Sequence, residues 1–178
     1  MSKYAGTKTE ANLNEAFAGE SMARNKYTYF ASVARKAGYV QIANIWEETA
    51  RNEKEHAELW FKELEGIGTV EENLKASAEG EHYEHTDMYK RMAADAREEG
   101  FEALAVKFEK VGEVEATHEN RYNMLLEHML QGNTFKGNAP LGWKCGNCGY
   151  IFWGEEAPEV CPACAHPKAY FERKVENY

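Results

Sequence analysis

Proline is absent from this 178-residue chain before Pro140, and cysteine is absent before Cys145. Because proline disrupts helix interiors, its absence leaves this part of the chain free to form long helices. All four prolines and all four cysteines lie within residues 140–167. In a reducing compartment, cysteines grouped in this way indicate a metal site more than disulfides.

The sequence also lacks long apolar runs and an excess of basic residues. No apolar run approaches the roughly 20 residues that span a bilayer. The opening MSKYAGTKTEANLNEAF has no apolar segment typical of a secretory signal. The 30 acidic residues outnumber the 21 basic ones, which form no cluster. We therefore expect a cytoplasmic protein that binds neither nucleic acid nor a membrane.

Helical periodicity fills the first part of the chain. It predicts four helices, at 8–37, 39–65, 70–98 and 100–130, each followed by glycine as at a helix C-terminus. These glycines are Gly38, Gly66, Gly68, Gly100 and Gly132. The polar stretch QGNTFKGNAPLG predicts a linker, and the short aromatic runs after it indicate β-structure. We expect an all-α four-helix bundle at 1–131, a linker at 132–142 and a small β domain at 143–178.

Ionisable residues interrupt the apolar stripe of every predicted helix. In RNEKEHAELW (51–60), Glu53 and His56 follow Trp46 and precede Trp60, at positions where apolar side chains are expected. The other helices carry similar residues on or beside the stripe. The full set is Glu20, Glu53, His56, Glu81, Glu84, Glu115 and His118.

The two halves of the helical part resemble each other. Glu53-x-x-His56 recurs in the second half as Glu115-x-x-His118, and Glu20 recurs at almost the same offset as Glu81. Tyr27 follows Glu20 by seven residues, whereas Tyr89 follows Glu81 by eight. The pattern indicates a repeated helix pair.

A single Glu-x-x-His motif is weak, because it is also typical of a solvated acidic face. Glu79-x-x-His82 is such a copy, and we interpret His82, His85 and His128 as surface or packing residues. The inward group differs, since unpaired buried carboxylates cost several kcal/mol and carboxylates that face one another ionise together only around a cation. Carboxylates that bridge two metals, each capped by one imidazole, match the ferritin-like di-iron pattern.

Glu84 breaks the symmetry between the halves, because its counterpart is Ala23. An additional carboxylate beside one metal can replace an imidazole when the charge of that metal changes. We expect one iron to shift between His56 and Glu84 with redox state. The alternative is a solvated glutamate on an acidic helix.

The cysteines form two Cys-x2-Cys motifs, in WKCGNCGY (143–150) and VCPACAHP (160–167). The thiolates of Cys145, Cys148, Cys161 and Cys164 suit a tetrahedral site for zinc or one iron. Gly149 allows a tight turn whose amides face sulfur. Zinc would stabilise the fold of a small domain and iron would carry single electrons; the spacing favours neither.

Together these residues resemble the rubrerythrin family, in which a ferritin-like di-iron domain precedes a rubredoxin-like domain. The resemblance covers nearly the whole chain and includes AEGEHYEHTDMY (78–89) and CPACAHPKAYFE (161–172). It implies that Tyr27 and Tyr89 hydrogen-bond ligand carboxylates and that His166 lies between the iron sites. It implies a di-iron centre held by Glu20, Glu53, His56, Glu81, Glu84, Glu115 and His118, and one iron held by the four cysteines.

Two features depart from related patterns. Ala165 replaces a glycine of free-standing rubredoxins, and the twelve-residue spacer between the cysteine motifs is shorter than theirs.

The connection around GIGTV supplies about half of the ~11 residues that a ferritin-like crossover along a ~38 Å helix needs. The bundle is therefore either simply up-down-up-down or a domain-swapped homodimer, which we favour and in which each di-iron site draws on two chains.

The resemblance implies a non-haem peroxidase that reduces hydrogen peroxide to water in oxidative-stress defence. Its FeS4 site would receive electrons from an external reductase or a rubredoxin. Because no G-x-G-x-x-G fingerprint is present, NAD(P)H would act only through that reductase. One alternative is an iron-handling ferroxidase, which oxidises Fe(II) and passes it to a store. Electrons supplied by an FeS4 site would undo that storage. Another is a non-enzymatic zinc-ribbon module on a helical adaptor.

Overall fold

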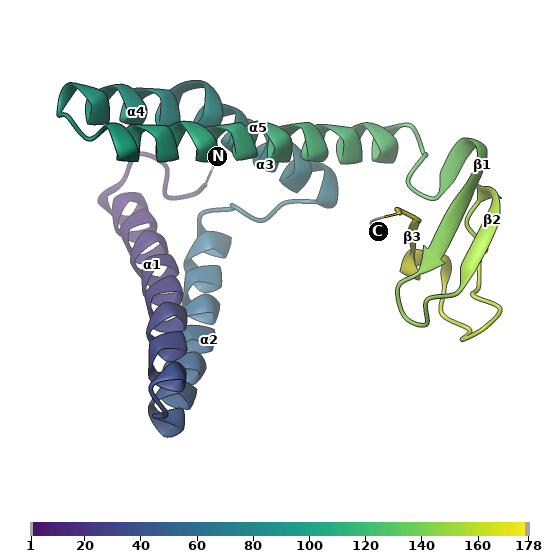
Figure 1. The fold of residues 1–178 in the computed structure, drawn as a ribbon, viewed down its shortest axis with the longest axis horizontal. Coiled ribbons are helices and arrows are strands. Elements are labelled where there is room, and N and C mark those ends of the chain that lie inside the picture. Colours follow the sequence, from purple (N-terminus) through teal and green to yellow (C-terminus); the bar gives the residue numbers. More distant parts are fainter. Residues whose placement is uncertain (1, 177–178) are drawn as a thin grey trace. The chain divides into compact units, whose positions relative to one another are not determined.

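The computed structural model describes residues 2–176 and divides the chain into two compact units, Met1–Thr69 and Val70–Tyr178. The first unit holds α1 (Lys8–Lys36) and α2 (Val40–Glu63). The second holds α3 (Val70–Tyr83), the π-helical segment η1 (Glu84–Met88), α4 (Tyr89–Glu98), α5 (Glu102–Leu130) and a small sheet (Figure 1). The fold class is therefore the predicted one, a ferritin-like helical region followed by a rubredoxin-like domain.

In the first unit, α1 and α2 form an antiparallel hairpin (Figure 1). The Thr7 hydroxyl caps α1 by accepting a hydrogen bond from the amide of Glu10 at 3.2 Å. Gly38, with φ of 85°, lets the chain turn into α2, because a residue with a side chain rarely adopts that angle. At the end of α2 the left-handed residue is Glu65, with φ of 57°, and not the predicted Gly66.

In the second unit, α3, η1 and α4 form one helical rod that packs along α5. The π segment explains the unequal spacing of the repeat. Between Glu81 and Tyr89 the chain has one residue more than between Glu20 and Tyr27, and a π turn accommodates one additional residue within a helix. The predicted helix at 70–98 is thus present, with a wider turn at Glu84–Met88.

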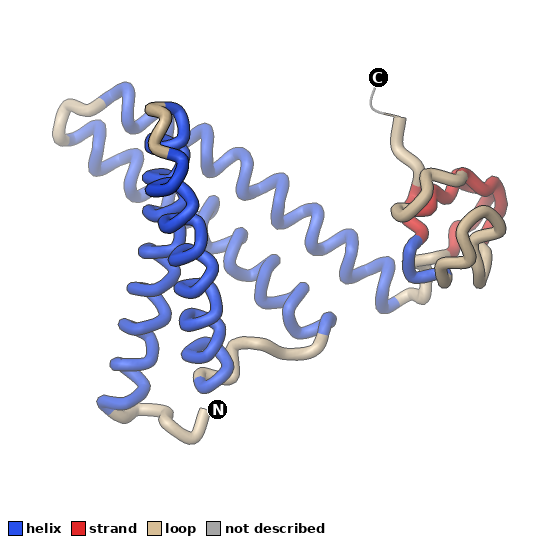
Figure 2. Tube along the Cα trace, turned by 90° about the horizontal axis from the view of Figure 1, so that it is seen from below, coloured by secondary structure: helices blue, strands red, loops and turns tan. Residues whose placement is uncertain are grey.

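The C-terminal sheet, whose strands are red in Figure 2, consists of β1 (Lys136–Cys145), β2 (Ile151–Glu156) and β3 (Phe171–Arg173). The strand order is β2-β1-β3, with antiparallel pairs. Trp143 is fully buried, and its indole Nε1 donates a hydrogen bond to the carbonyl oxygen of Gly154 at 3.0 Å. Cys145, Cys161 and Phe171 share its core. β1 begins at Lys136, so much of the segment predicted as a linker is strand.

The helix pairs bury mainly small side chains. The buried core of the first pair consists of Ala31, Ala34 and Ala43. That of the second pair consists of Ala93, Ala96 and Ala105. Among the described residues no acidic, basic or histidine side chain is buried, and large apolar side chains such as Val33 and Ile45 are exposed. None of the helices in the described part of the chain is long and apolar enough to cross a membrane.

Candidate metal centres

The first group of predicted ligands lies in the α1–α2 hairpin. Glu20 comes from α1, and Glu53 and His56 come from successive turns of α2, so that one donor atom of each lies within 4.8 Å of the others. His56 Nδ1 is 2.8 Å from a carboxylate oxygen of Glu53 and 3.9 Å from one of Glu20. The side chain of Glu53 is 16% exposed, which places it between the two helices.

The second group has the same form in the second unit. Glu81 comes from α3, Glu115 and His118 come from α5, and their donor atoms again lie within 4.8 Å of one another. His118 Nδ1 is 2.7 Å from a carboxylate oxygen of Glu115 and 3.6 Å from one of Glu81. Six of the seven predicted ligands are therefore brought together as two equivalent groups of two carboxylates and one imidazole, while Glu84 belongs to neither group.

The carboxylates of each group oppose one another's ionisation. Burial raises the pKa of the Glu20 carboxyl, and its contact with Glu53 raises that pKa further. Burial also raises the pKa of Glu81, as do the charges of Glu115 and Glu84. A cation placed between such groups removes this conflict, because it favours the charged form of every carboxylate around it. The donor set of each group therefore fits a hard or borderline metal ion.

Tyr89 lies beside the second group. Burial raises the pKa of its phenol, and the charges of Glu84, Glu115 and Glu81 raise that pKa further. Gly112 of α5 leaves room for this ring, since a Cβ at Gly112 would lie 3.3 Å from that of Tyr89. The phenol thus keeps its proton close to carboxylates that can accept it in a hydrogen bond.

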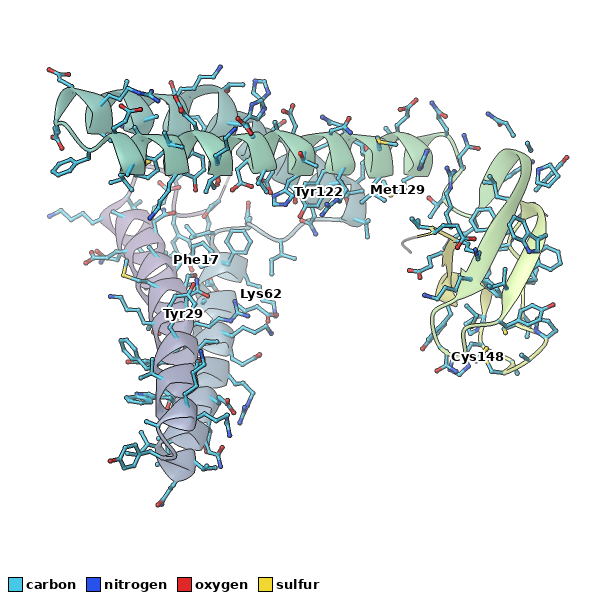
Figure 3. The ribbon with its side chains drawn as sticks, in the orientation of Figure 1. Phe17, Tyr29, Lys62, Tyr122, Met129 and Cys148 are labelled. Carbon is cyan, nitrogen blue, oxygen red and sulfur yellow. The ribbon has the colours of Figure 1, made fainter. Side chains whose placement is uncertain are left out.

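The four cysteines form a preorganised tetrahedron. The sulfur atoms of Cys145 and Cys164 are 3.7 Å apart, as are those of Cys148 and Cys161, and all four lie within 4.8 Å of one another. Metal–sulfur bonds of about 2.3 Å give tetrahedral edges of about 3.8 Å, so the observed spacing fits one ion. Cys148 lies in the turn after β1 and is exposed (Figure 3), whereas Cys145 and Cys161 are buried.

Two equivalent turns direct backbone amides at this site. Gly149 and Ala165 follow the second cysteine of each motif, have φ of 78° and 58°, and donate to the carbonyls of Cys145 and Cys161 at 2.8 Å. Ala165 thus adopts the left-handed backbone conformation that glycine favours, which costs about 1–2 kcal/mol for a residue with a side chain. The amide of His166 lowers the pKa of the Cys164 thiol to about 6.

Crowding among the thiols works against complete ionisation. The amide of Tyr150 favours the thiolate of Cys148, but hydrogen bonds with the other three thiols, together with partial loss of hydration, raise the pKa of Cys148 to about 12. All four sulfurs can be thiolates together only around a cation. The arrangement therefore supports a tetrahedral metal site.

Comparison with known proteins identifies the family. The rubrerythrin profile matches residues 11–126, and the profile of the rubrerythrin rubredoxin-like domain matches residues 143–172. The chain belongs to the rubrerythrin family. A rubrerythrin of Porphyromonas gingivalis is 50% identical over 97% of this chain and 93% of its own length. A rubrerythrin of Nitratidesulfovibrio vulgaris is 46% identical over 97% of both chains, and nigerythrin of the same organism is 35% identical over 96% of this chain and 88% of its own.

Membership of the family identifies the cofactors, a di-iron centre and one iron in an FeS4 site. The carboxylate and imidazole groups fit the former, and the four cysteines form the latter.

One group of donors was missed by the sequence analysis. The donor atoms of His82, His85 and Glu119 lie within 4.8 Å of one another. The sequence alone had led us to interpret both histidines as surface or packing residues. A hydrogen bond from His85, reinforced by one from His82, lowers the pKa of Glu119. Glu119 lies on the other helix, 34 residues or more along the chain, so helical spacing alone did not link it to the histidines.

Proposed function

We propose that this protein is a peroxidase that reduces hydrogen peroxide to water at its di-iron centre and is re-reduced through its FeS4 site. The observation that carries the proposal is the combination, in one chain, of two matched carboxylate–imidazole groups with a tetrahedral cysteine site. The first suits a dinuclear centre and the second suits transfer of single electrons. The donor outside the protein would be a reductase or a rubredoxin in the cytoplasm.

Each part of the chain has a distinct role in this proposal. Residues 1–131 form the catalytic domain, and residues 143–178, together with the part of β1 that precedes them, form the electron-entry domain. When bound, the two irons supply the two electrons that, with two protons, convert hydrogen peroxide to two waters. Glu20, Glu53, Glu81, Glu84 and Glu115 hold the irons with His56 and His118.

Two tyrosines complete the site. Tyr89 keeps its phenolic proton because its pKa is raised, so it can donate a hydrogen bond to a ligand carboxylate and fix that carboxylate's orientation. We assign the same role to Tyr27, its counterpart in the repeat. Both residues act by positioning the donors.

A comparison of oxidants tests the function. The iron-loaded protein is reduced without oxygen, which leaves three electrons per chain, and is then mixed with two equivalents of hydrogen peroxide or one of oxygen, either of which can take four electrons. The colour of the FeS4 iron is followed by stopped flow. We expect reoxidation by peroxide to be much faster than by oxygen, because the site is proposed to transfer two electrons to one peroxide. Faster reoxidation by oxygen, or an FeS4 iron that stays reduced, would instead support a ferroxidase.

We further propose that the complete di-iron centre forms in a domain-swapped homodimer. Residues 64–69 connect α2 to α3 and reach at most about 22 Å when extended, whereas the 24-residue α2 is about 36 Å long. The connection is therefore too short for the crossover that would place α3 parallel to α2 in one chain. Exposed apolar side chains on both helix pairs provide surface for pairing with a second chain.

Mixing two inactive variants tests the swap. Glu53→Ala damages only the first group of ligands, and Glu115→Ala only the second. When equal amounts are unfolded and refolded together, a swapped dimer should regain about a quarter of the intact di-iron sites, because half of the dimers are mixed and each has one intact site. Iron content and peroxide turnover measure the recovery. Each variant refolded alone is the control, and no recovery in the mixture would rule out the swap.

A further inference from the structure

We propose that His82, His85 and Glu119 form a third metal site, which takes a single divalent first-row transition ion of the Zn²⁺ or Fe²⁺ type. It lies within the second unit and uses none of the residues assigned to the di-iron centre or the FeS4 site. The proposal is therefore independent of the peroxidase function.

The geometry brings three donors from two helices together. Glu119 of α5 lies between the histidines, with one carboxylate oxygen 3.0 Å from His82 Nδ1 and the other 2.5 Å from His85 Nε2. The imidazole rings meet edge to face with centroids 5.4 Å apart. With metal–donor bonds of about 2.0–2.2 Å, a small outward movement of these side chains suffices to admit one ion.

The donor set determines the class of ion. Two imidazoles and one carboxylate with the remaining positions open are typical of catalytic zinc and of non-haem ferrous iron. Calcium and magnesium prefer oxygen donors alone. The side chain of His82 is 60% exposed, whereas those of His85 and Glu119 are 21% and 23% exposed. An ion can therefore enter from solvent and keep water at its open positions.

The internal repeat provides an independent argument. In the α1–α2 hairpin the positions equivalent to His82 and Glu119 are Ser21 and Ala57. They also lie together, since both line one surface pocket with Arg24. The same place in the fold therefore exists twice, and a helix pair packs there without metal donors. The histidines and Glu119 are therefore not required for the packing of such a pair, and what distinguishes this half is their donor geometry.

An ion at this site would join η1 to α5. His85 lies in the π segment directly after Glu84, and Glu119 directly follows His118. Because the ion would bind the folded chain and not the unfolded one, it would also stabilise the second helix pair.

Metal binding to the full-length, iron-loaded protein tests the proposal. Zn²⁺ is titrated against a chromophoric chelator, and in a second, oxygen-free arm Fe²⁺ is used. We expect one ion per chain beyond the irons, with the iron content unchanged. Zn²⁺ should bind more tightly than Fe²⁺, as it does at most sites with nitrogen and oxygen donors. His85→Asn, His82→Asn and Glu119→Gln should each weaken binding by more than the roughly 10–100-fold that loss of an outer-shell partner causes.

The matched control is Glu113→Gln, which neutralises an exposed carboxylate of the same helix and should leave binding unchanged. Far-UV circular dichroism and FeS4 colour establish that each variant is folded. His82→Asn should have the least effect on packing, because His82 is exposed. The proposal is overturned if neither ion binds, if the variants bind as tightly as the parent, or if zinc enters only as iron leaves.

Discussion

Replacing Glu115 by alanine is expected to remove the di-iron centre and to lower peroxide turnover at least about 10³-fold. The side chain of Glu115 is 13% exposed, less than those of Glu20, Glu53 and Glu81, and its carboxylate lies 2.7 Å from His118 Nδ1. Its loss removes one donor and releases another. Metal ions contribute several kcal/mol of transition-state stabilisation, and each tenfold change in rate corresponds to about 1.4 kcal/mol. Iron content and steady-state turnover are the measurements.

The C-terminal domain provides an internal control for this variant, because its FeS4 colour should persist. Glu113→Gln again serves as the matched substitution, since that carboxylate pairs with Lys110 at the surface. A Glu115→Ala protein that retained both irons of the centre and full turnover would show that Glu115 is not a ligand.

Replacing Cys161 by serine is expected to unfold the C-terminal domain and abolish its colour. Cys161 is 1% exposed and shares the core with Trp143 and Phe171. Structural metals in small domains contribute apparent binding energies of about 10–16 kcal/mol, which exceeds the stability of most small domains. Loss of FeS4 absorbance, tryptophan fluorescence and proteolysis of residues beyond 131 measure the effect.

Cys148→Ser distinguishes the effect of losing the metal from the effect of disturbing the core. Cys148 is exposed, so its replacement should also weaken the metal site but should disturb packing less than Cys161→Ser. In both variants steady-state peroxide reduction with an external donor should fall at least about 100-fold, whereas a single turnover of chemically reduced protein should persist. Undiminished steady-state turnover would mean that electrons reach the di-iron centre by another route.

Local signals account for the parts of the fold that could be predicted. The absence of proline, the apolar period and the glycines after each segment predicted the helices, and the paired cysteine motifs predicted the tetrahedral site. These signals depend on neighbours in sequence, or on a spacing that only one geometry satisfies. The repeat explains why Glu20 joins Glu53 and His56 just as Glu81 joins Glu115 and His118, because equivalent helix pairs place equivalent residues together.

Features that depend on contacts between helices were not predictable in the same way. The histidines at 82 and 85 have no sequence relation to Glu119, and only the packing of α3 and η1 on α5 joins them. The inward stripe predicted which face carries Glu53 and Glu115, but not how much of that face one helix pair covers. Hence the structure buries no acidic, basic or histidine side chain among the described residues.

The π segment at Glu84–Met88 has a consequence for the history of the gene. The two helix pairs have the form of a duplication, and the offset between equivalent residues grows by one only between Glu81 and Tyr89. One inserted codon accounts for that change. The wider turn lies at Glu84, the carboxylate that the first half lacks. The two halves therefore differ at this turn in two ways, by one additional residue and by a glutamate in place of Ala23, while every other helix kept its register.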